Sequence, residues 1–243
     1  SKTINKILRK VVTEKEGTAS LADIFGYDVA GKTGTAKKYG GGDKNLNTFI
    51  SIFPSKNPKH VFATIDHIID TFPGRGDETL MPGGKIFITT MRNLAKEFNI
   101  TLFDINDPRH GISHLISAEQ GIALPGNIVT CPDSHTCTLG ALGAIGWGVG
   151  SSDCEHALAT STLSSEKPKQ MKVSFRGKLN EGVNSKDMML HLIEKYSASG
   201  GSGYAIEFGG DTIDAMPLEN RFTLCNMAVE FSAFTGIIAP DQK

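Results

Sequence analysis

The spacing of apolar residues divides this chain into two stretches with different patterns. In 2–12, apolar positions recur every three or four residues, which predicts a helix with one buried face. Short apolar runs bounded by glycine, proline and asparagine follow, and they predict strands at 27–30, 48–53 and 60–65. From about residue 85, apolar strands alternate with helices, which is typical of an α/β fold. The pattern therefore predicts a short α+β segment followed by a larger α/β body.

Two helices and two strands have defined boundaries in the second stretch. Ser152 followed by Glu155 fits a capping box that opens a helix, and Ser185 can cap another helix. The second helix is expected to bury one face, made of Met188, Met189, Leu192 and Ile193. Polar and apolar residues alternate in 169–176, which predicts a half-buried strand, and residues 204–208 predict the next strand.

Glycine recurs at short intervals in the middle of the chain, at positions 140, 143, 146, 148 and 150. This run invites comparison with a dinucleotide-binding loop, but no G-x-G-x-x-G occurs in it. The spacing favours a helix whose face of small residues allows close packing.

Composition limits the class of protein. The formal net charge is −1, with 39% hydrophobic and 21% charged residues, so the chain is expected to be globular and to bind neither nucleic acid nor a membrane. No apolar run reaches the ~18 residues of a membrane-spanning helix, and the first residues lack the pattern of a signal peptide. Its 4 cysteines form no C-x-x-C pair and are expected to be reduced thiols. Together these features predict a cytoplasmic protein.

One phosphate-loop pattern, G-x-x-x-x-G-K-[ST], occurs at residues 26–33. A functional loop of this kind requires a helix directly after Lys32 and Thr33. The glycines at 40–42 oppose that helix, because each costs roughly 1 kcal/mol of helix stability. A nucleotide site is therefore not favoured.

The same residues fit a different family. The matching segments are Val29-Ala30-Gly31-Lys32-Thr33-Gly34-Thr35-Ala36, Phe49-Ile50-Ser51-Ile52-Phe53-Pro54 and Asn57-Pro58-Lys59. They resemble the C-terminal end of a penicillin-binding transpeptidase domain, whose Lys-Thr-Gly strand would be Lys32, Thr33 and Gly34. The resemblance implies that Lys32 and Thr33 bound a substrate carboxylate, and that residues 1–59 are a short α+β remnant. The family's nucleophilic serine is expected upstream of the matching residues, and without it no acyl-enzyme forms.

A second set of motifs runs from residue 61 to residue 241. Its segments are Val61-Phe62-Ala63-Thr64-Ile65-Asp66-His67, His110-Gly111-Ile112-Ser113-His114, Glu119-Gln120-Gly121, Leu124-Pro125-Gly126, Cys131-Pro132-Asp133-Ser134-His135-Thr136, Glu155-His156-Ala157-Leu158-Ala159-Thr160, Thr223-Leu224-Cys225-Asn226-Met227-Ala228-Val229-Glu230 and Ala239-Pro240-Asp241. In this order they resemble the large subunit of 3-isopropylmalate dehydratase, within the aconitase superfamily. The resemblance implies that residues 60–243 form part of an aconitase-type three-layer α/β body.

Dehydration of a hydroxy acid requires removal of a C–H proton and expulsion of hydroxide, which leaves only if it is protonated or bound by a Lewis acid. A carboxylate that holds a histidine fixes its tautomer and supports the imidazolium form. The resemblance implies three such catalytic pairs, which are Asp66 with His67, Asp133 with His114, and Glu230 with His135. It also implies that Ser134 contacts the substrate and that Asn226 helps to fix the site.

Each histidine also has a simpler interpretation. A lone histidine is more often an ordinary surface or core residue, which is the interpretation preferred for His60, His156 and His191. The spacing of His110 and His114 would fit a metal pair on a helix, but Gly111 argues against a regular helix there.

A cofactor and a partner are implied by the same resemblance. The family's [4Fe-4S] cluster is bound by three cysteines, two of them in a C-x-x-C pair. Cys131, Cys137, Cys154 and Cys225 lack this spacing, so no metal ligand is expected in this chain and the ligands are expected beyond Asp241. The family's catalytic serine base lies on a small subunit, which is the expected partner. The expected substrate is a small hydroxy-dicarboxylic acid.

The larger resemblance implies a hydro-lyase that interconverts 2- and 3-isopropylmalate in leucine biosynthesis, with this chain inactive on its own. Two alternatives stay open: a peptidoglycan transpeptidase fragment with a foreign tail, and a non-functional chimeric fragment. Both parent patterns place a strand near 60–66, where a chimeric reading frame, a gene rearrangement or an assembly artefact would join them. Pro132 and residues 152–155 depart from the usual family sequence, so methylmalate and dimethylmalate stay open as substrates.

Overall fold

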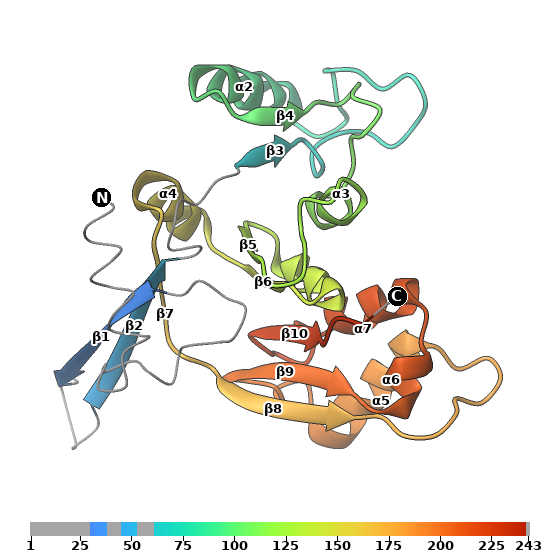
Figure 1. The fold of residues 1–243 in the computed structure, drawn as a ribbon. Helices are drawn as coiled ribbons and strands as arrows, with labels where there is room; N and C mark the ends of the chain where they lie inside the picture. Colours follow the sequence, from blue (N-terminus) through green and yellow to red (C-terminus); the bar gives the residue numbers. More distant parts are fainter. Residues whose placement is uncertain (1–29, 38–44, 53–60, 242–243) are drawn as a thin grey trace. The chain divides into compact units, whose positions relative to one another are not determined.

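The computed structural model (Figure 1) describes residues 30–37 and 45–52, as backbone strands, and residues 61–241. These residues belong to two units. One unit is Lys59–Ile122, and the other combines Ser1–Pro58 with Ala123–Lys243. The helix predicted at 2–12 lies outside the described residues.

The unit of residues 59–122 contains a two-stranded parallel sheet and two helices. Its elements are β3 (Phe62–Thr64), α2 (Gly84–Glu97), β4 (Thr101–Phe103) and α3 (Ser113–Glu119). Its buried core consists of Ile88 of α2 with Ile65 and Ile105, which follow the two strands. The strand predicted at 60–65 is confirmed by β3, although it is shorter.

Arg92 of α2 ties this helix to an acidic residue on each side of it in the sequence. Its guanidinium donates to Asp104 at 2.7 and 3.0 Å and to Asp77 at 2.5 and 2.9 Å. These hydrogen bonds lower the pKa of both carboxyl groups below the ordinary value and raise the pKa of Arg92. The contacts hold α2 to the loop before it and to the end of β4.

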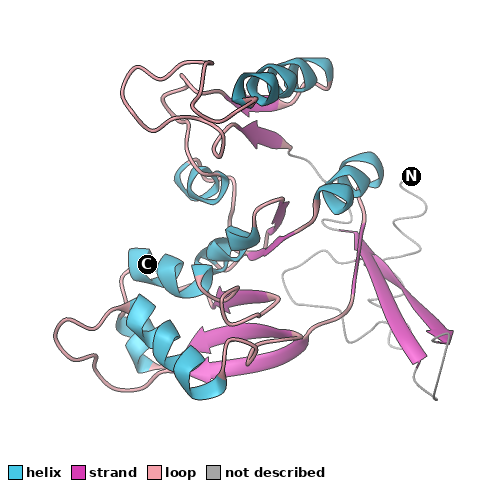
Figure 2. Ribbon diagram, turned by 180° about the vertical axis from the view of Figure 1, so that it is seen from behind, coloured by secondary structure: helices cyan, strands magenta, loops and turns pink. Residues whose placement is uncertain are grey.

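The other unit is built on a three-stranded parallel sheet in the order β10-β9-β8, seen from opposite sides in Figures 1 and 2. Its elements are β8 (Lys169–Ser174), α5 (Ser185–Tyr196), β9 (Tyr204–Gly209), α6 (Asp211–Ala215), α7 (Leu218–Asn226) and β10 (Thr235–Ile238). Ile206 and Phe208 of the central strand are fully buried and pack with Met189 of α5 and Leu224 of α7. The predicted α/β class is confirmed, the structure adds that these strands are parallel, and the three-layer arrangement stays a prediction.

Helix α5 has the predicted face but not the predicted cap. Met188, Met189 and Leu192 are buried, and Ile193 packs against the same core. The cap is Asn184 rather than Ser185: its side chain accepts from the Lys186 and Asp187 amides, and Asp187 accepts from the Asn184 amide at 2.8 Å. The prediction was wrong because Ser185 is buried as the first helical residue.

The helix predicted to open at Ser152 is also present, as α4 (Ser151–Thr160), but the capping box is wrong. Gly150 is the cap residue, and no side chain caps the helix. Ser152 already lies within the first turn, so its hydroxyl is too far along the helix to act as a cap.

The glycine-rich run forms a 3-10 helix, η2 (Ser134–Leu142), and a strand, β6 (Ile145–Gly148), instead of one helix. Strand β5 (Ile128–Cys131) precedes η2 and pairs parallel with β6. Gly143 ends η2 with a φ of 72°, a conformation that favours glycine. The expected close packing is present. A Cβ on Gly140 would collide with the Gly236 carbonyl, and one on Gly146 would collide with the Thr136 carbonyl.

A further sheet of this unit joins the two stretches of the sequence. Its strands β1 (Ala30–Lys37), β2 (Asn45–Ile52) and β7 (Leu163–Ser165) pair antiparallel in that order. The strand predicted at 48–53 corresponds to β2. Lys32, Thr33 and Gly34 lie in β1, where they pair with residues 48–50.

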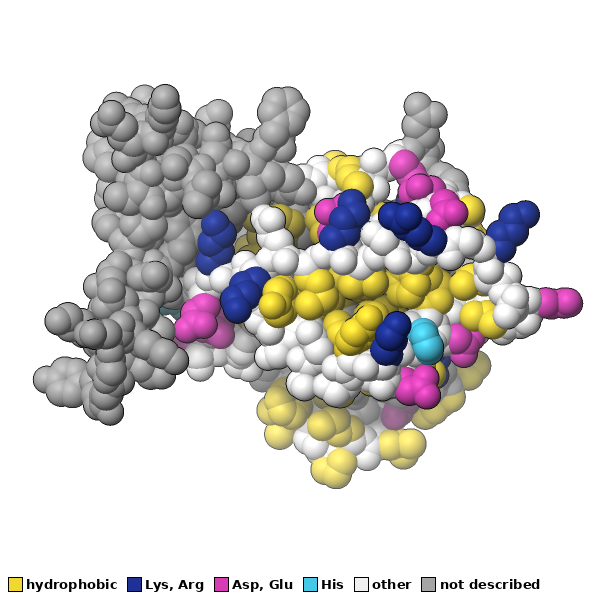
Figure 3. Space-filling view, turned by 90° about the horizontal axis from the view of Figure 1, so that it is seen from below, with side chains coloured by type: hydrophobic (Ala, Val, Ile, Leu, Met, Phe, Trp, Pro, Cys, Tyr) yellow, Lys and Arg dark blue, Asp and Glu magenta, His cyan; other side chains and the backbone are white. Residues whose placement is uncertain are grey.

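Figure 3 shows the molecule of Figure 1 from below. A band of hydrophobic side chains bordered by charged ones is visible on this face. The exposed hydrophobic residues of the unit that contains β8 and α5 include Leu179, Val183, Leu190 and Tyr196. Across the described residues, no helix combines the length and apolar character that crossing a membrane requires.

Candidate active site

Asp133 and the first turn of η2 position His135. Asp133 is the cap residue of η2, and its carboxylate accepts from the His135 amide at 2.7 Å. Its carbonyl accepts from Thr136 Oγ1, also at 2.7 Å. Gly148 of β6 permits this approach, because a Cβ there would lie 2.6 Å from the Asp133 carbonyl oxygen. The loop after β5 thus holds His135 at the start of η2.

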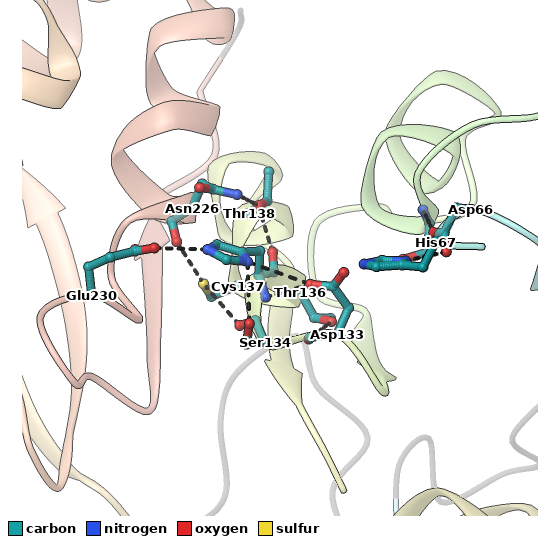
Figure 4. A network of polar contacts seen from close by, with 11 residues as sticks. Asp66, His67, Asp133, Ser134, Thr136, Cys137, Thr138, Asn226 and Glu230 are labelled. Atoms are coloured by element: carbon teal, nitrogen blue, oxygen red, sulfur yellow. Dashed lines mark hydrogen bonds and ion pairs between the residues drawn. The ribbon is translucent and has the colours of Figure 1, made fainter. Parts of the chain in front are cut away.

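Polar side chains approach both nitrogens of the His135 ring, and Figure 4 labels two of them, Glu230 and Ser134. Nε2 lies 2.9 Å from Glu230 Oε1, and since an ionised carboxylate only accepts, Nε2 is assigned the proton. Nδ1 lies 3.3 Å from Ser134 Oγ and 3.7 Å from Asp133 Oδ1. The His135 and Glu230 side chains are 36% and 41% exposed. The expected contact between His135 and Glu230 is therefore present, and proton exchange at this ring would run through Nδ1.

Asn226, at the end of α7, supports the backbone of η2. Its Nδ2 donates to Thr138 Oγ1 at 2.8 Å, and Thr138 Oγ1 donates to the His135 carbonyl at 2.6 Å. The backbone carbonyl of Asn226 accepts a hydrogen bond from Cys137 Sγ at 3.4 Å. Sequence reasoning missed Thr138, although residues three apart share one side of a 3-10 helix and would have placed it beside His135.

Asp66 and His67 form the expected pair within the unit of residues 59–122. His67 Nδ1 lies 2.6 Å from Asp66 Oδ1, and Asp66 Oδ2 accepts from the Ser113 amide at 3.0 Å. Because β3 ends at Thr64, the two residues lie in a loop, where adjacent side chains are not forced to opposite faces. The His67 side chain is 69% exposed, whereas that of Asp66 is 14% exposed.

His114 lies in α3, whereas Asp133 belongs to the other unit. Their pairing stays a prediction, as does the convergence of all the expected site residues at one concave surface. His110 precedes α3, so the helical metal pair that its spacing would fit is absent from the described residues. His156 and His191 are exposed, which agrees with their simpler interpretation, and His60 lies outside the described residues.

A pocket of about 430 Å³ opens beside η2. It is lined by Pro132, Ser134, Cys137, Trp147, Gly148, Val149, Val229, Ala233 and Phe234. The rings of Trp147 and Phe234 lie 5.2 Å apart in its wall. Ser134 thus borders both the His135 ring and a mainly apolar pocket.

Comparison with known proteins shows the family to which the sequence belongs. The model of the aconitase family (aconitate hydratase) matches residues 53–243. The chain belongs to the aconitase family. This family member is 47% identical over 188 residues to the 3-isopropylmalate dehydratase large subunit 2 of Salmonella typhimurium, covering 77% of the chain and 40% of the relative. It is 46% identical over 187 residues to the large subunit 1 of Mannheimia succiniciproducens, covering 77% and 39%. The chain thus spans about 40% of the length of such relatives.

The beginning of this aconitase-family chain matches a second model. Residues 1–67 match the penicillin-binding protein transpeptidase domain. The two matches overlap at 53–67, which includes the boundary expected between residues 59 and 60. That boundary, and the division into a remnant and a dehydratase fragment, stay predictions.

The aconitase family implies an iron–sulfur cluster, which requires thiolate ligands. Among residues 61–241, no group of three or more His, Cys, Asp or Glu side chains is placed to hold a metal ion. Burial raises the pKa of Cys137 to about 12 and the pKa of Cys225 well above the ordinary value. The described cysteines do not fit a cluster, and no step below runs through one.

Proposed function

We propose that this chain forms part of the large subunit of a 3-isopropylmalate dehydratase, a hydro-lyase that interconverts 2- and 3-isopropylmalate in leucine biosynthesis. The strongest support is the His135–Glu230 pair at 2.9 Å, next to Asp133 and Ser134. The pair lies within residues 53–243, which match the aconitase-family model, and the chain is 47% identical over 188 residues to a large subunit of that name. The proposed substrate is a small hydroxy-dicarboxylic acid.

Dehydration, the first half of the proposed interconversion, needs two proton transfers, and the second half reverses them as water adds back with its hydroxyl on the other carbon. A base takes a proton from the carbon next to the carbinol carbon, and the electron pair of that C–H bond becomes the new double bond. The C–O bond breaks as an acid protonates the hydroxyl, which leaves as water. His67 and His135, each oriented by a carboxylate, are suited to hold and donate a proton. We assign these two residues and His114 to proton handling.

The other site residues are assigned to support and binding. Asp66, Asp133 and Glu230 orient and charge-balance the histidines, Ser134 contacts the substrate, and Asn226 holds η2. The base is assigned to a small partner subunit. That assignment rests on the relatives, which are named as large subunits.

An exchange of segments tests the proposal. The part of the Salmonella typhimurium large subunit that matches this chain is replaced by the matching residues of the chain, and the product is combined with the small subunit of that organism. We expect interconversion of 2- and 3-isopropylmalate and growth of a large-subunit deletion strain without leucine. A His135→Gln version is expected to fail both tests. Loss of activity in the unsubstituted exchange, with the protein folded, would contradict the proposal.

A second candidate function is peptidoglycan transpeptidation. It is supported by the match of residues 1–67 and by the position of Lys32, Thr33 and Gly34 in strand β1. The test is incubation of the full chain with a fluorescent penicillin. We expect no stoichiometric, heat-stable label, because the family's nucleophilic serine is not among the matched residues. A stable label would favour the transpeptidase and would be mapped by peptide analysis.

A further inference from the structure

The loop that carries Asp66 and His67 is held by a second segment, 110–113. Thr64 Oγ1 donates to the Gly111 carbonyl at 2.9 Å, and the Ser113 amide donates to Asp66 Oδ2 at 3.0 Å. Between these two contacts, His110 Nε2 lies 2.8 Å from the Ile65 carbonyl. Three hydrogen bonds thus join two short segments that are more than forty residues apart in the sequence.

The contacts of His110 define its tautomer. The Ile65 carbonyl only accepts, so Nε2 must carry the proton that it donates. Arg75 Nη2 lies 3.0 Å from His110 Nδ1, and because a guanidinium only donates, Nδ1 must be an acceptor. Both contacts require the same neutral ring with the proton on Nε2. Arg75 Nη2 also lies 3.3 Å from the Ile105 carbonyl, which links the ring to the core of this unit.

The contact of His67 with Asp66 places a proton on the other ring nitrogen. Its Nδ1 lies 2.6 Å from Asp66 Oδ1, so the proton is on Nδ1. This arrangement depends on the backbone of residues 64–66, which sets the direction of the Asp66 carboxylate. The His110 bond to the Ile65 carbonyl fixes the residue directly before Asp66.

We propose that His110 is a positioning residue for the Asp66–His67 pair: by donating to the Ile65 carbonyl while accepting from Arg75, it holds the loop in which Asp66 selects the Nδ1–H tautomer of His67. The relevance to catalysis rests on the proposed dehydratase function. The structural part of the proposal does not.

Two variants separate positioning from simple packing. His110→Ala removes both hydrogen bonds. His110→Gln keeps one donor and one acceptor in a side-chain amide, which can bond the Ile65 carbonyl and Arg75 together. His191→Ala is the matched control, because His191 is exposed on α5 in the other unit.

The first measurement needs no activity. In the full chain labelled with ¹⁵N-histidine, ring nitrogen shifts report which nitrogen of each neutral ring carries the proton. We expect His110 in the Nε2–H form and His67 in the Nδ1–H form. His110→Ala should shift His67 toward a mixture with the Nε2–H form, which free histidine prefers. His110→Gln should restore the Nδ1–H form of His67, and His191→Ala should leave that form unchanged. An unchanged His67 tautomer in His110→Ala, or no restoration in His110→Gln, would overturn the proposal.

The second measurement uses the exchanged large subunit. We expect kcat to fall about tenfold for His110→Ala, with a smaller change in KM, and to return within about threefold for His110→Gln, as is typical for groups that orient an active residue. If the unsubstituted exchange is inactive while the His67 tautomer follows His110, the dehydratase function fails and the positioning role stands. If the exchange is active and His110→Ala has full activity, the positioning role in catalysis is overturned.

Discussion

At the scale of single residues, the proposed function assigns a role to the charge of Glu230 and not only to its ability to accept a hydrogen bond. Glu230 and His135 come from distant parts of the chain and meet at 2.9 Å on a partly exposed surface. An exposed pair of this kind contributes little to stability, roughly 1 kcal/mol or less. We propose that the pair serves proton handling, because a carboxylate at Nε2 supports a positive charge on the ring.

Glu230→Gln tests this role. Glutamine still accepts a hydrogen bond from Nε2, but it no longer balances an imidazolium. In the exchanged large subunit we expect kcat to fall about 10²-fold with little change in KM, the size typical of lost acid–base assistance. Glu207→Gln is the control, because Glu207 forms an exposed ion pair with Lys172 in the same unit. A fall of less than about threefold for Glu230→Gln would mean that charge at this position is not used.

The candidate site could be predicted from sequence only as a set of residue types. The motifs identified Asp133, His135 and Glu230, and the contact between the last two was expected and is present. The contribution of Thr138 was missed, because a threonine beside a histidine has no chemical signal until the helix type is known. His110 was assigned no role because its value lies in two hydrogen bonds to distant loops.

At the scale of elements, patterns of burial were predictable and the ends of helices were not. The buried face of α5 follows from the spacing of its apolar residues. Which residue caps α4 or α5 depends on the position at which the backbone becomes helical. In both cases the residue predicted as the cap already lies inside the helix. The glycine run was predicted as one helix because sequence alone does not show that Gly143 turns the chain.

Close packing of η2 makes Gly140 sensitive to substitution. A methyl group in Gly140→Ala would meet the Gly236 carbonyl of β10, which cannot move without disturbing the parallel sheet. We expect the free energy of unfolding to fall by about 1–3 kcal/mol, as for overpacked cores. Denaturant unfolding measures the change. Gly76→Ala is the control, since a Cβ at that position would have no neighbour within 4 Å, and equal stability of the two variants would refute the packing argument.

The ion pairs of Arg92 with Asp77 and Asp104 predict that their contribution to the stability of the fold is lost in acid. The hydrogen bond from Arg92 lowers the pKa of Asp104 in the folded state below its ordinary value of 3.8. A depressed carboxyl pKa stabilises the fold above the unfolded value, and this contribution is lost as the pH falls through the folded pKa. Arg92→Met should therefore lower the free energy of unfolding by at most about 1 kcal/mol near neutral pH, since the groups are partly exposed.

The difference between wild type and Arg92→Met should shrink below about pH 4, where Asp104 becomes protonated in both. Urea unfolding followed from neutral to acidic pH measures it. Lys186→Met, an exposed change on α5, serves as the control. A difference that is constant across this pH range would show that Arg92 acts through packing alone.

At the scale of the whole molecule, the chain combines matches to two families. Strand β2, which lies with β1 in the transpeptidase match, pairs with β7 of the aconitase-family region. Strand pairing between backbones needs no common ancestry, because every residue except proline offers the same donor and acceptor. We expect the hydrophobic residues of 1–59 to form no shared core with residues 67–243. The two stretches match different families, so their hydrophobic faces are expected to fit different packing partners.

The proposed dehydratase site is built on the His135–Glu230 pair within one unit. Titration of the ¹⁵N-histidine-labelled chain with 2-isopropylmalate tests it most directly. We expect the ring signals of His135 to shift with a single, saturable dissociation constant, while those of the exposed His156 and His191 stay unchanged. No shift of His135, or shifts of His156 and His191 as large as that of His135, would contradict a hydro-lyase site at this pair.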